Sequence, residues 1–171
     1  MFSAGRAWFL PTSTTRGRQS LARSIEVRLD ASGNIDLDHL EELLQDPRFQ
    51  DRLRIGSFSA ASNVTGIRSN VVEISTLLHK YGAIACFDYA ACAPYVEINM
   101  NPDHGGDGDA SIDAIYISPH KFLGGPGSSG VLIFDSQLYQ NRVPDHPGGG
   151  TVEWTNPWGD HKYLDDIESR E

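Results

Sequence analysis

The chain has 171 residues, of which 39% are hydrophobic and 22% are charged, a composition typical of one ordinary globular domain. Its net charge of -9 argues against a nucleic-acid partner, because phosphate backbones attract basic surfaces. No apolar run approaches the ~20 residues that a membrane-spanning helix needs, so no membrane partner is expected either.

The start of the chain is basic. No acidic residue precedes Glu26, whereas four arginines are interleaved with serines and threonines: Arg6, Arg16, Arg18 and Arg23. This composition is typical of an organelle transit peptide. The alternative, which we favour, is that residues 1–24 are an atypical or misassigned N-terminal segment, because a strand pattern follows without a cleavage linker. Under this alternative the expected location is cytoplasmic.

Strand and helix patterns then alternate along the chain. Strands are predicted at residues 25–29, 54–58, 83–87, 113–117 and 130–134. Two helices carry apolar residues at helical spacing: Leu37, Leu40, Leu43 and Leu44 in the first, and Val71, Ile74, Leu77 and Leu78 in the second. Asp36 can cap the first helix, and Gly82 can end the second. This alternation predicts an α/β fold with a mostly parallel sheet flanked by helices.

The regular pattern covers residues 25–142, which we interpret as one α/β domain portion. A short helical stretch is predicted near Gln137. Residues 143–171 are rich in glycine, proline and tryptophan and show no periodicity, which indicates a long loop. The charged stretch at residues 163–171 resembles the first turns of a helix that the chain does not finish.

Polar residues follow three of the predicted strands. Asn63 lies in the loop after the second strand, Asp88 closes the third, and residues 118–121 follow the fourth. Ligands of parallel α/β sheets bind outside the carboxyl ends of the strands. We therefore expect these residues to share one site.

Lys121 and Asp88 suggest which ligand this site takes. Pyridoxal phosphate needs a lysine that forms a Schiff base with its aldehyde, and a carboxylate that holds the charge on its ring nitrogen. Lys121 stands before a glycine-rich turn at residues 124–127, which allows close approach of the backbone to a bound group. Each residue also has a structural alternative, since Lys121 can be a surface cation and Asp88 a turn former.

Ser118, His120 and Asn63 complete the candidate site. Hydroxyl and imidazole donors beside a glycine-rich turn suit a phosphate, which makes Ser118 and His120 candidate phosphate ligands. The amide of Asn63 can bind a ring hydroxyl or a substrate carboxylate. A turn serine, a surface histidine and a turn asparagine are the alternatives for the three residues.

The remaining candidates favour structural roles. Cys86 and Cys92 do not indicate a disulfide framework, and Cys86 is expected to be a small core residue. The loop at residues 103–109 alternates acids and glycines but lacks the closing glutamate of a calcium loop, so we interpret it as a solvated acidic connection. The scattered histidines suggest no metal ligand cluster: His79, His146 and His161.

Together these motifs resemble the class V aminotransferase superfamily, which includes cysteine desulfurases, selenocysteine lyases and kynureninase-like enzymes. Asn-Val-Thr-Gly at residues 63–66, Asp-Tyr-Ala-Ala at residues 88–91 and Ser-Pro-His-Lys at residues 118–121 occur in the family's order and spacing. The stretch at residues 147–152 is similar to a segment that follows the lysine in desulfurase-like members. The resemblance covers residues 25–171.

The resemblance implies a role for each site residue. Lys121 forms the Schiff base with pyridoxal phosphate and moves the α-proton, and Asp88 binds the ring nitrogen. Ser118 and His120 hold the phosphate, while Asn63 faces the cofactor hydroxyl or the substrate carboxylate. The implied fold is part of the large domain of fold-type I enzymes. A small amino acid is the implied substrate, and a homodimer the implied assembly.

The chain also departs from the family's pattern. Cysteine desulfurases usually carry glutamine where this chain has Ala91. No upstream phosphate-binding loop is evident in residues 1–24, and neither Cys86 nor Cys92 matches the desulfurase nucleophile. The chain therefore resembles the middle of a protein more than twice as long. Two functions remain: an enzyme domain that depends on pyridoxal phosphate, or a catalytically incompetent fragment that acts as a binding or dimerisation module.

Overall fold

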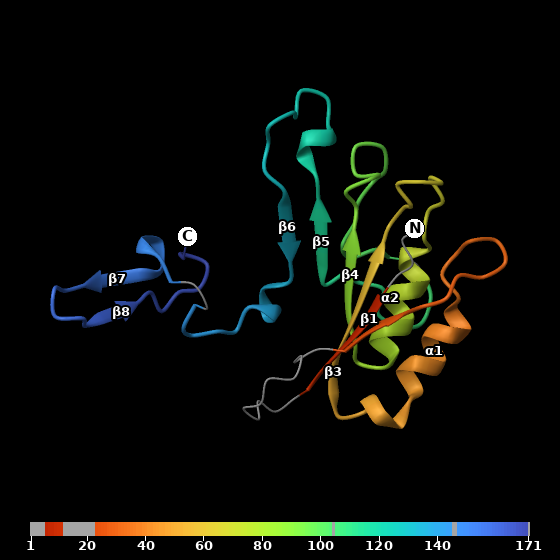
Figure 1. Cartoon of the computed structure of the whole chain (residues 1–171), viewed down its shortest axis with the longest axis horizontal. Helices are drawn as coiled ribbons and strands as arrows, with labels where there is room; N and C mark the ends of the chain where they lie inside the picture. Colours follow the sequence, from red (N-terminus) through yellow and green to blue (C-terminus); the bar gives the residue numbers. More distant parts are fainter. Residues whose placement is uncertain (1–5, 12–22, 104, 145–146, 171) are drawn as a thin grey trace. The chain divides into compact units, whose positions relative to one another are not determined.

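A six-stranded sheet organises the chain, with the strand order β2-β1-β3-β4-β5-β6 (Figure 1). The computed structural model describes residues 6–11, 23–103, 105–144 and 147–170. The strands of this sheet are β1 (Arg6–Pro11), β2 (Arg23–Glu26), β3 (Arg52–Ser59), β4 (Ile84–Asp88), β5 (Ala114–Ile117) and β6 (Val131–Phe134).

The centre of the sheet is parallel and its flanks are antiparallel. Strands β3, β4 and β5 run in one direction, as the strand–helix alternation predicts, and the α/β class is confirmed. Strand β1 runs antiparallel to β2 and β3, and β6 runs antiparallel to β5. Parallel pairing usually needs a crossover helix. The connection from β5 to β6 contains only a short 3₁₀ turn, so the chain returns beside β5 in the opposite direction.

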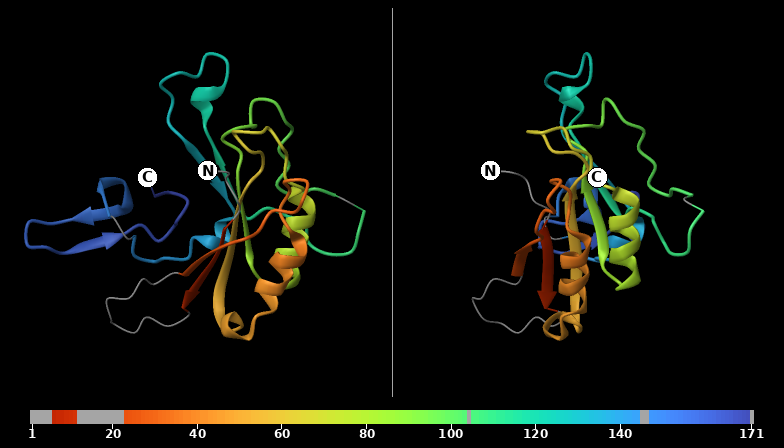
Figure 2. Two further views of the ribbon diagram at one scale, coloured as in Figure 1. Left: turned by 45° about the vertical axis from the view of Figure 1, so that its right-hand side comes forward. Right: turned by 90° about the vertical axis from the view of Figure 1, so that its right-hand side faces the viewer.

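Helices α1 (Leu37–Gln45) and α2 (Val71–Lys80) occupy the segments predicted for them. The Asp36 carboxylate accepts a hydrogen bond from the His39 amide at 2.9 Å, which confirms the predicted cap of α1. Helix α2 lies against one side of the sheet with α1 beside it (Figures 1 and 2). The chain turns at Gly82 with φ of 65°, a left-handed conformation that favours glycine, directly after α2 ends.

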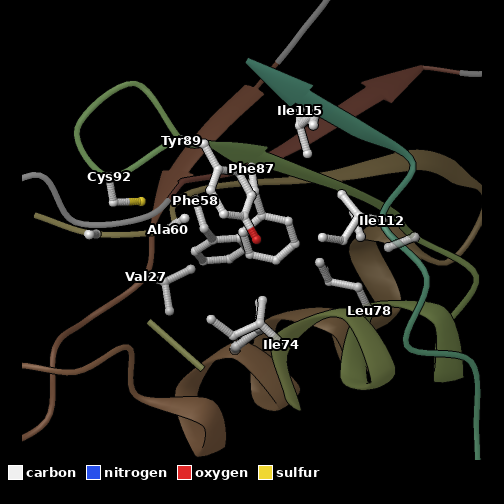
Figure 3. Packing of buried hydrophobic residues seen from close by; sticks show 14 of the residues in the cluster. Val27, Phe58, Ala60, Ile74, Leu78, Phe87, Tyr89, Cys92, Ile112 and Ile115 are labelled. Carbon is white, nitrogen blue, oxygen red and sulfur yellow. The ribbon is translucent and has the colours of Figure 1, made fainter. Parts of the chain in front are cut away.

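The core lies between α2 and the central strands. Phe58, Phe87 and Ile115 are in register on β3, β4 and β5, so their side chains share the face that meets Ile74 and Leu78 of α2 (Figure 3). All five are at most 2% exposed. Burial of such side chains stabilises a fold by about 1.5–3 kcal/mol each.

Gly56 on β3 lets α2 approach the sheet closely. A Cβ atom at this position would lie 2.6 Å from Leu78 Cδ1 and 2.8 Å from Phe58 Cε2, far inside van der Waals contact. Only glycine leaves room there for both side chains. Arg54, two residues earlier, donates hydrogen bonds to the carbonyl oxygens of Leu44, at 3.1 Å, and of Tyr81. It thereby ties the ends of both helices to β3.

Residues from Asp135 onward form a second compact unit, which contains the hairpin of β7 (Val152–Thr155) and β8 (His161–Tyr163). The expectation of a loop without regular structure over residues 143–171 is therefore wrong for these strands. Residues 164–170 form turns instead of the predicted start of a helix. The expected domain boundary at residue 142 lies inside this second unit.

Short 3₁₀ turns complete the secondary structure: η1 (Pro47–Phe49), η2 (Pro119–Lys121), η3 (Ser136–Leu138) and η4 (Gly149–Thr151). The helical stretch predicted near Gln137 is η3. Arg16 and Arg18 lie outside the described residues, so the transit-peptide interpretation stays a prediction. Among the described residues, no helix is both long enough and apolar enough to cross a membrane.

His79 joins the end of α2 to the loop that precedes β5. Its Nε2 atom lies 2.9 Å from Asp113 Oδ2, and its Nδ1 atom lies 3.1 Å from the carbonyl oxygen of Asp109. Asp113 Oδ2 also accepts the Ala85 amide at 2.6 Å. Burial lowers the pKa of His79, but the hydrogen bonds to Asp113 and Asp109 outweigh it and raise the pKa above 6.5.

The free energy of unfolding should therefore depend on the protonation of His79. Folding raises the pKa of His79. The stabilisation that protonated His79 gives is therefore fully present below the pKa of the unfolded state, and it is lost as the pH rises through the pKa of the folded state. His79→Gln should cost about 1.5–3 kcal/mol near pH 6 and less near pH 8 in urea denaturation. His161→Gln, at an exposed position of β8, is the control and should change stability little at either pH. Equal losses for His79→Gln at both values would contradict the linkage.

Candidate active site

Three loops meet at one edge of the sheet. Because β3, β4 and β5 are parallel, their carboxyl ends lie at the same edge, where the following loops gather (Figure 1). Asn63 lies in the loop after β3, Asp88 is the last residue of β4, and Ser118 directly follows β5. The structure thus brings the predicted segments to one edge, as the strand pattern suggested. The chemical roles assigned to their side chains stay predictions.

Asp88 presents its carboxylate at this edge. The side chain is exposed, and its Oδ1 atom accepts a hydrogen bond from the Ala90 amide at 2.7 Å. This bond fixes the orientation of the carboxylate. Within the described residues the Oδ2 atom makes no hydrogen bond, so it is available to a ligand. The turn-former alternative and the ligand role are therefore compatible.

Ser59 and Tyr116 flank Asp88, a feature that the sequence pattern did not predict. Asp88 is in register with Ser59 on β3 and with Tyr116 on β5, so the three side chains emerge on the same face of the sheet. Partial burial raises the pKa of the Tyr116 phenol. Finding these neighbours requires the strand register, which apolar runs alone do not define.

Lys121 ends the 3₁₀ turn η2 directly after β5. Its amide donates to the Ser118 carbonyl at 3.0 Å, and the Phe122 amide donates to the Pro119 carbonyl at 2.9 Å. The side chain is exposed. A lysine here therefore projects from a hydrogen-bonded turn anchored at a strand end.

The chain has three lysines, and their surroundings differ. Lys80 Nζ lies 2.7 Å from Glu41 Oε1, and Lys162 is paired with Glu153. Lys121 forms no ion pair with any residue that the structure describes. Its amine is thus the one of the three that is not already engaged by a carboxylate of the described chain.

The glycine-rich turn after Lys121 depends on close backbone contact. The Gly125 amide donates to the Phe122 carbonyl at 2.9 Å, and the Ser128 hydroxyl donates to the Gly125 carbonyl at 2.7 Å. A Cβ atom at position 125 would lie 2.0 Å from the Pro119 carbonyl oxygen, a severe clash with backbone. Glycine at this position therefore keeps η2 and Lys121 where they are.

The side chains of Ser118 and Asn63 make no local turn bonds within the described residues. Ser118 is half-buried at the start of η2, and its side chain makes no capping hydrogen bond. In the loop after β3 the Ser62 hydroxyl, and not Asn63, accepts the amides of Val64 at 3.2 Å and Thr65 at 3.1 Å. Asn63 is exposed and its amide has no hydrogen bond within the described part of the chain. This argues against the simple turn role for Asn63.

His120 lies between Pro119 and Lys121 in η2 and is exposed. A cavity of about 280 Å³ opens beside the loop after β3, lined by residues of the turn at 29–35 and by Ser59, Ser62 and Thr65. Asp88 and Lys121 do not line it. The candidate site is therefore an open edge of the sheet and not this cavity.

The two cysteines are buried and are not joined in a disulfide, as expected from the sequence. Burial, with a contribution from the Asp113 charge, raises the pKa of the Cys86 thiol to about 11. A thiol with so high a pKa is a poor nucleophile at neutral pH. This supports the interpretation of Cys86 as a core residue.

The acidic loop uses its carboxylates for its own turns. Asp103 accepts the Gly105 amide at 3.2 Å, and Asp109 accepts the Ser111 amide at 2.9 Å. Within the ranges that the structure describes, no group of three histidine, cysteine, aspartate or glutamate side chains could hold a metal ion. His104 and His146 lie outside those ranges.

Comparison with known proteins identifies the family. The family model of class-V aminotransferases matches residues 11–167, which is most of the chain and includes every candidate site residue. The chain belongs to the class-V aminotransferase family. The resemblance inferred from the motifs at residues 63–66, 88–91 and 118–121 is thus confirmed.

Curated relatives of this class-V aminotransferase chain include cysteine desulfurases. A probable cysteine desulfurase from Chlamydia muridarum is 33% identical over 135 residues, which are 79% of this chain and 30% of the relative. A histidine decarboxylase from Mesorhizobium japonicum is 29% identical over 120 residues, or 68% of this chain and 31% of the relative. The chain thus spans about a third of the length of such relatives.

Solved structures of the family are similar in fold. The cysteine desulfurase CsdA from Escherichia coli matches with a TM-score of 0.66 and 26% identity, over 86% of this chain and 33% of that one. The apo cysteine desulfurase from Thermococcus onnurineus matches with a TM-score of 0.63 and 26% identity, over the same shares. The class-V aminotransferase chain therefore corresponds to part of the fold of these enzymes.

Proposed function

We propose that this chain carries the cofactor-binding centre of a pyridoxal-phosphate-dependent enzyme of the cysteine desulfurase type, which acts on a small amino acid. The observation that carries the proposal is the amine of Lys121, which forms no ion pair within the described residues and shares a sheet edge with the exposed Asp88 carboxylate. A lysine amine and a carboxylate are the two groups that this cofactor requires of a protein.

The other residues at this edge fit the same cofactor. Pyridoxal phosphate presents an aldehyde, a ring hydroxyl, a cationic ring nitrogen and a phosphate. The edge offers an amine, the Oδ2 oxygen of the Asp88 carboxylate, the Asn63 amide and the Ser118 hydroxyl, and within the described residues the last three make no hydrogen bond. The close turn at Gly125 adds backbone that a phosphate can approach. Each group of the ligand thus has a donor or acceptor of suitable chemistry.

We assign one task to each residue. Lys121 Nζ would hold the cofactor through its aldehyde carbon, with loss of water, and once the substrate amine has displaced it the free amine would accept the α-proton of the substrate. Asp88 would hold the ring nitrogen, and the Ala90 amide fixes that carboxylate in place. Ser118 and His120 would hold the phosphate, and Asn63 would bind the ring hydroxyl or the substrate carboxylate. The cofactor, when bound, supplies the electron-accepting ring.

The family supports a proposal for the substrate class. The relatives are named for reactions of two amino acids, cysteine and histidine, so an amino acid is the substrate class we propose here. We propose further that the complete enzyme is a homodimer in the cytoplasm, where thiols such as Cys86 and Cys92 stay reduced. A protein that binds the cofactor without turnover is the second candidate.

An absorbance titration tests the proposal. Purified chain is mixed with pyridoxal phosphate, scanned, treated with borohydride and digested for mass spectrometry. We expect a visible absorption band that borohydride removes, and a reduced adduct on the peptide that contains Lys121. Absence of an adduct on this peptide, or an adduct on Lys80 or Lys162 instead, overturns the assignment. Adduct formation without release of product from any amino acid would favour the binding role.

Gly125→Ala should weaken cofactor binding. The added methyl clashes with the Pro119 carbonyl, so η2 must shift and carry Lys121 with it. We expect the dissociation constant for pyridoxal phosphate to rise about tenfold or more. Gly130→Ala is the matched control, because its Cβ atom would lie 3.8 Å from the nearest atom, the Ile117 carbonyl oxygen. Equal affinities of the two variants would show that the turn does not position the lysine.

A further inference from the structure

Asp113 joins the start of β5 to the start of β4 at two points. Its amide donates a hydrogen bond to the Ala85 carbonyl at 2.9 Å, and its Oδ2 atom accepts the Ala85 amide at 2.6 Å. Strand β5 begins at Ala114, so the carboxylate takes the place of a strand carbonyl that would otherwise accept this amide. The two hydrogen bonds thus tie one residue of β4 to the residue that leads into β5.

This tie matters because the ladder between β4 and β5 is short. It contains three residue pairs, the last of which joins Asp88 to Tyr116. A shift of one residue would move β5 along β4 by about 3.3 Å and turn its side chains to the opposite face. Asp88 ends β4, whereas Ser118 and Lys121 follow β5. The position of β5 along β4 therefore sets where Ser118 and Lys121 lie relative to the Asp88 carboxylate.

His79 holds the Asp113 carboxylate and uses both of its ring nitrogens. Nε2 lies 2.9 Å from Asp113 Oδ2, and Nδ1 lies 3.1 Å from the carbonyl oxygen of Asp109. Both oxygens are acceptors, since a carbonyl carries no hydrogen and Oδ2 already accepts the Ala85 amide. A neutral imidazole has one N–H group, whereas an imidazolium has two. The two hydrogen bonds together therefore require the protonated ring.

Charged and titratable groups on neighbouring elements favour this protonated ring, which is 14% exposed. The carboxylates of Asp113 and Asp109 lie 2.9 and 3.5 Å from its nitrogens, and both belong to the segment before β5. On β4, burial and the Asp113 charge raise the pKa of the Cys86 thiol to about 11, so this group stays neutral. The next residue of α2, Lys80, is paired with Glu41 of α1. Loss of the proton would thus remove one hydrogen bond from a ring that faces two carboxylates.

We propose that protonated His79 is a positioning residue for the cofactor site, because it fixes the Asp113 carboxylate that sets β5 against β4. We call His79, Asp113 and Ala85 the latch. The inference rests on the proposed function, since it concerns the placement of η2 relative to Asp88. As the pH rises and His79 loses its proton, the carboxylate is held less firmly and β5 is displaced in more of the molecules. Affinity for the cofactor falls with the fraction of molecules in which both strand ends are in place.

Nuclear magnetic resonance of the cofactor-free chain tests the latch itself. At pH 6 we expect both ring nitrogens of His79 to carry protons. His79→Gln should speed hydrogen exchange of the Ala85 amide about tenfold more than that of the Phe58 amide, which reports unfolding of the whole sheet. A neutral His79 ring at pH 6 would overturn the latch. Equal acceleration at both amides would do the same, because it would mean that His79 supports global stability alone.

Binding of pyridoxamine phosphate tests the effect of the latch on the site. This form of the cofactor has an amine in place of the aldehyde, so its binding does not require a deprotonated Lys121. Between pH 6 and pH 8 we expect the dissociation constant of the wild-type chain to rise about threefold to tenfold more than that of His79→Gln. His161→Gln, at an exposed position of β8, is the control and should keep the wild-type pH profile.

Asp113→Asn is the second variant. It keeps an oxygen for the Ala85 amide but removes the charge that favours the imidazolium, so it should flatten the pH profile as His79→Gln does. Circular dichroism establishes that the variants are folded at each pH. Identical profiles for the wild-type chain and both variants would overturn the positioning role and leave the proposed function standing. A wild-type chain that binds neither form of the cofactor would overturn both, whatever the exchange rate of the Ala85 amide.

Discussion

Lys121→Ala should abolish the covalent adduct that borohydride traps between the chain and pyridoxal phosphate. The variant retains the Asp88 carboxylate and the η2 turn, whose hydrogen bonds use backbone atoms only. It can therefore still bind the cofactor without a covalent bond, at lower affinity. The expected loss of adduct is complete because the other two lysines are held by Glu41 and Glu153.

Lys80→Ala provides the matched control for this experiment. Lys80 is an exposed lysine on α2, and its amine is already 2.7 Å from Glu41 Oε1. Its removal should leave the adduct and the visible absorption band at wild-type levels. Unfolding curves of both variants should resemble that of the wild-type chain, because exposed lysines contribute little to stability. If Lys121→Ala kept the adduct, the covalent role would belong to another amine and the proposed mechanism would fail.

The central part of the fold could be predicted because local and tertiary signals agree there. The apolar spacing of Leu37, Leu40 and Leu44 and the cap at Asp36 favour α1. Tertiary packing buries Leu40 and Leu44 fully and Leu37 partly. The continuous apolar run before Asp88 likewise indicates a strand buried on both faces. At such positions the helix or strand that the local sequence favours is the same element that packing in the core stabilises.

Strand β1 and the β7–β8 hairpin were not predicted, for reasons that differ. Strand β1 lies in the basic segment, where the composition of arginines, serines and threonines outweighed a short strand-like run. The β7–β8 hairpin was hidden by the proline and glycine content of its surroundings. Its turn is closed by Asn156, whose side-chain oxygen accepts the amides of Trp158 at 3.0 Å and Asp160 at 2.9 Å. Asparagine and glycine in such a stretch are hairpin signals as well as loop signals.

In the candidate site, too, some features could be predicted from the sequence and others could not. Residues that follow strands could be placed at one sheet edge from the alternation pattern alone, which located Asn63, Asp88 and Lys121. The neighbours of Asp88 could not be found in this way, because a shift of one residue in register would turn Ser59 and Tyr116 to the opposite face. The need for glycine at position 125 is also a tertiary property, since it depends on where the Pro119 carbonyl lies.

Phe87→Ala should cost about 3–5 kcal/mol in the free energy of unfolding. The Phe87 side chain is fully buried on β4, between the strands on either side and the helix layer (Figure 3). Its ring centroid lies 6.2 Å from that of Phe58. Truncation would remove this contact and leave a cavity that α2 cannot fill, because Gly56 already places the helix against the sheet. Urea denaturation followed by circular dichroism measures the loss.

Phe122→Ala is the control that separates burial from residue type. Phe122 follows Lys121 and is 39% exposed, so its truncation removes less contact and creates no enclosed cavity. We expect a loss below about 1 kcal/mol. Losses of similar size for the two variants would mean that the helix layer does not pack on β4 as described.

Because Asp88 follows Phe87 directly, a β4 strand destabilised by Phe87→Ala should also release the Asp88 carboxylate from its place at the sheet edge. Phe87→Ala should therefore weaken cofactor binding even under conditions in which most molecules remain folded.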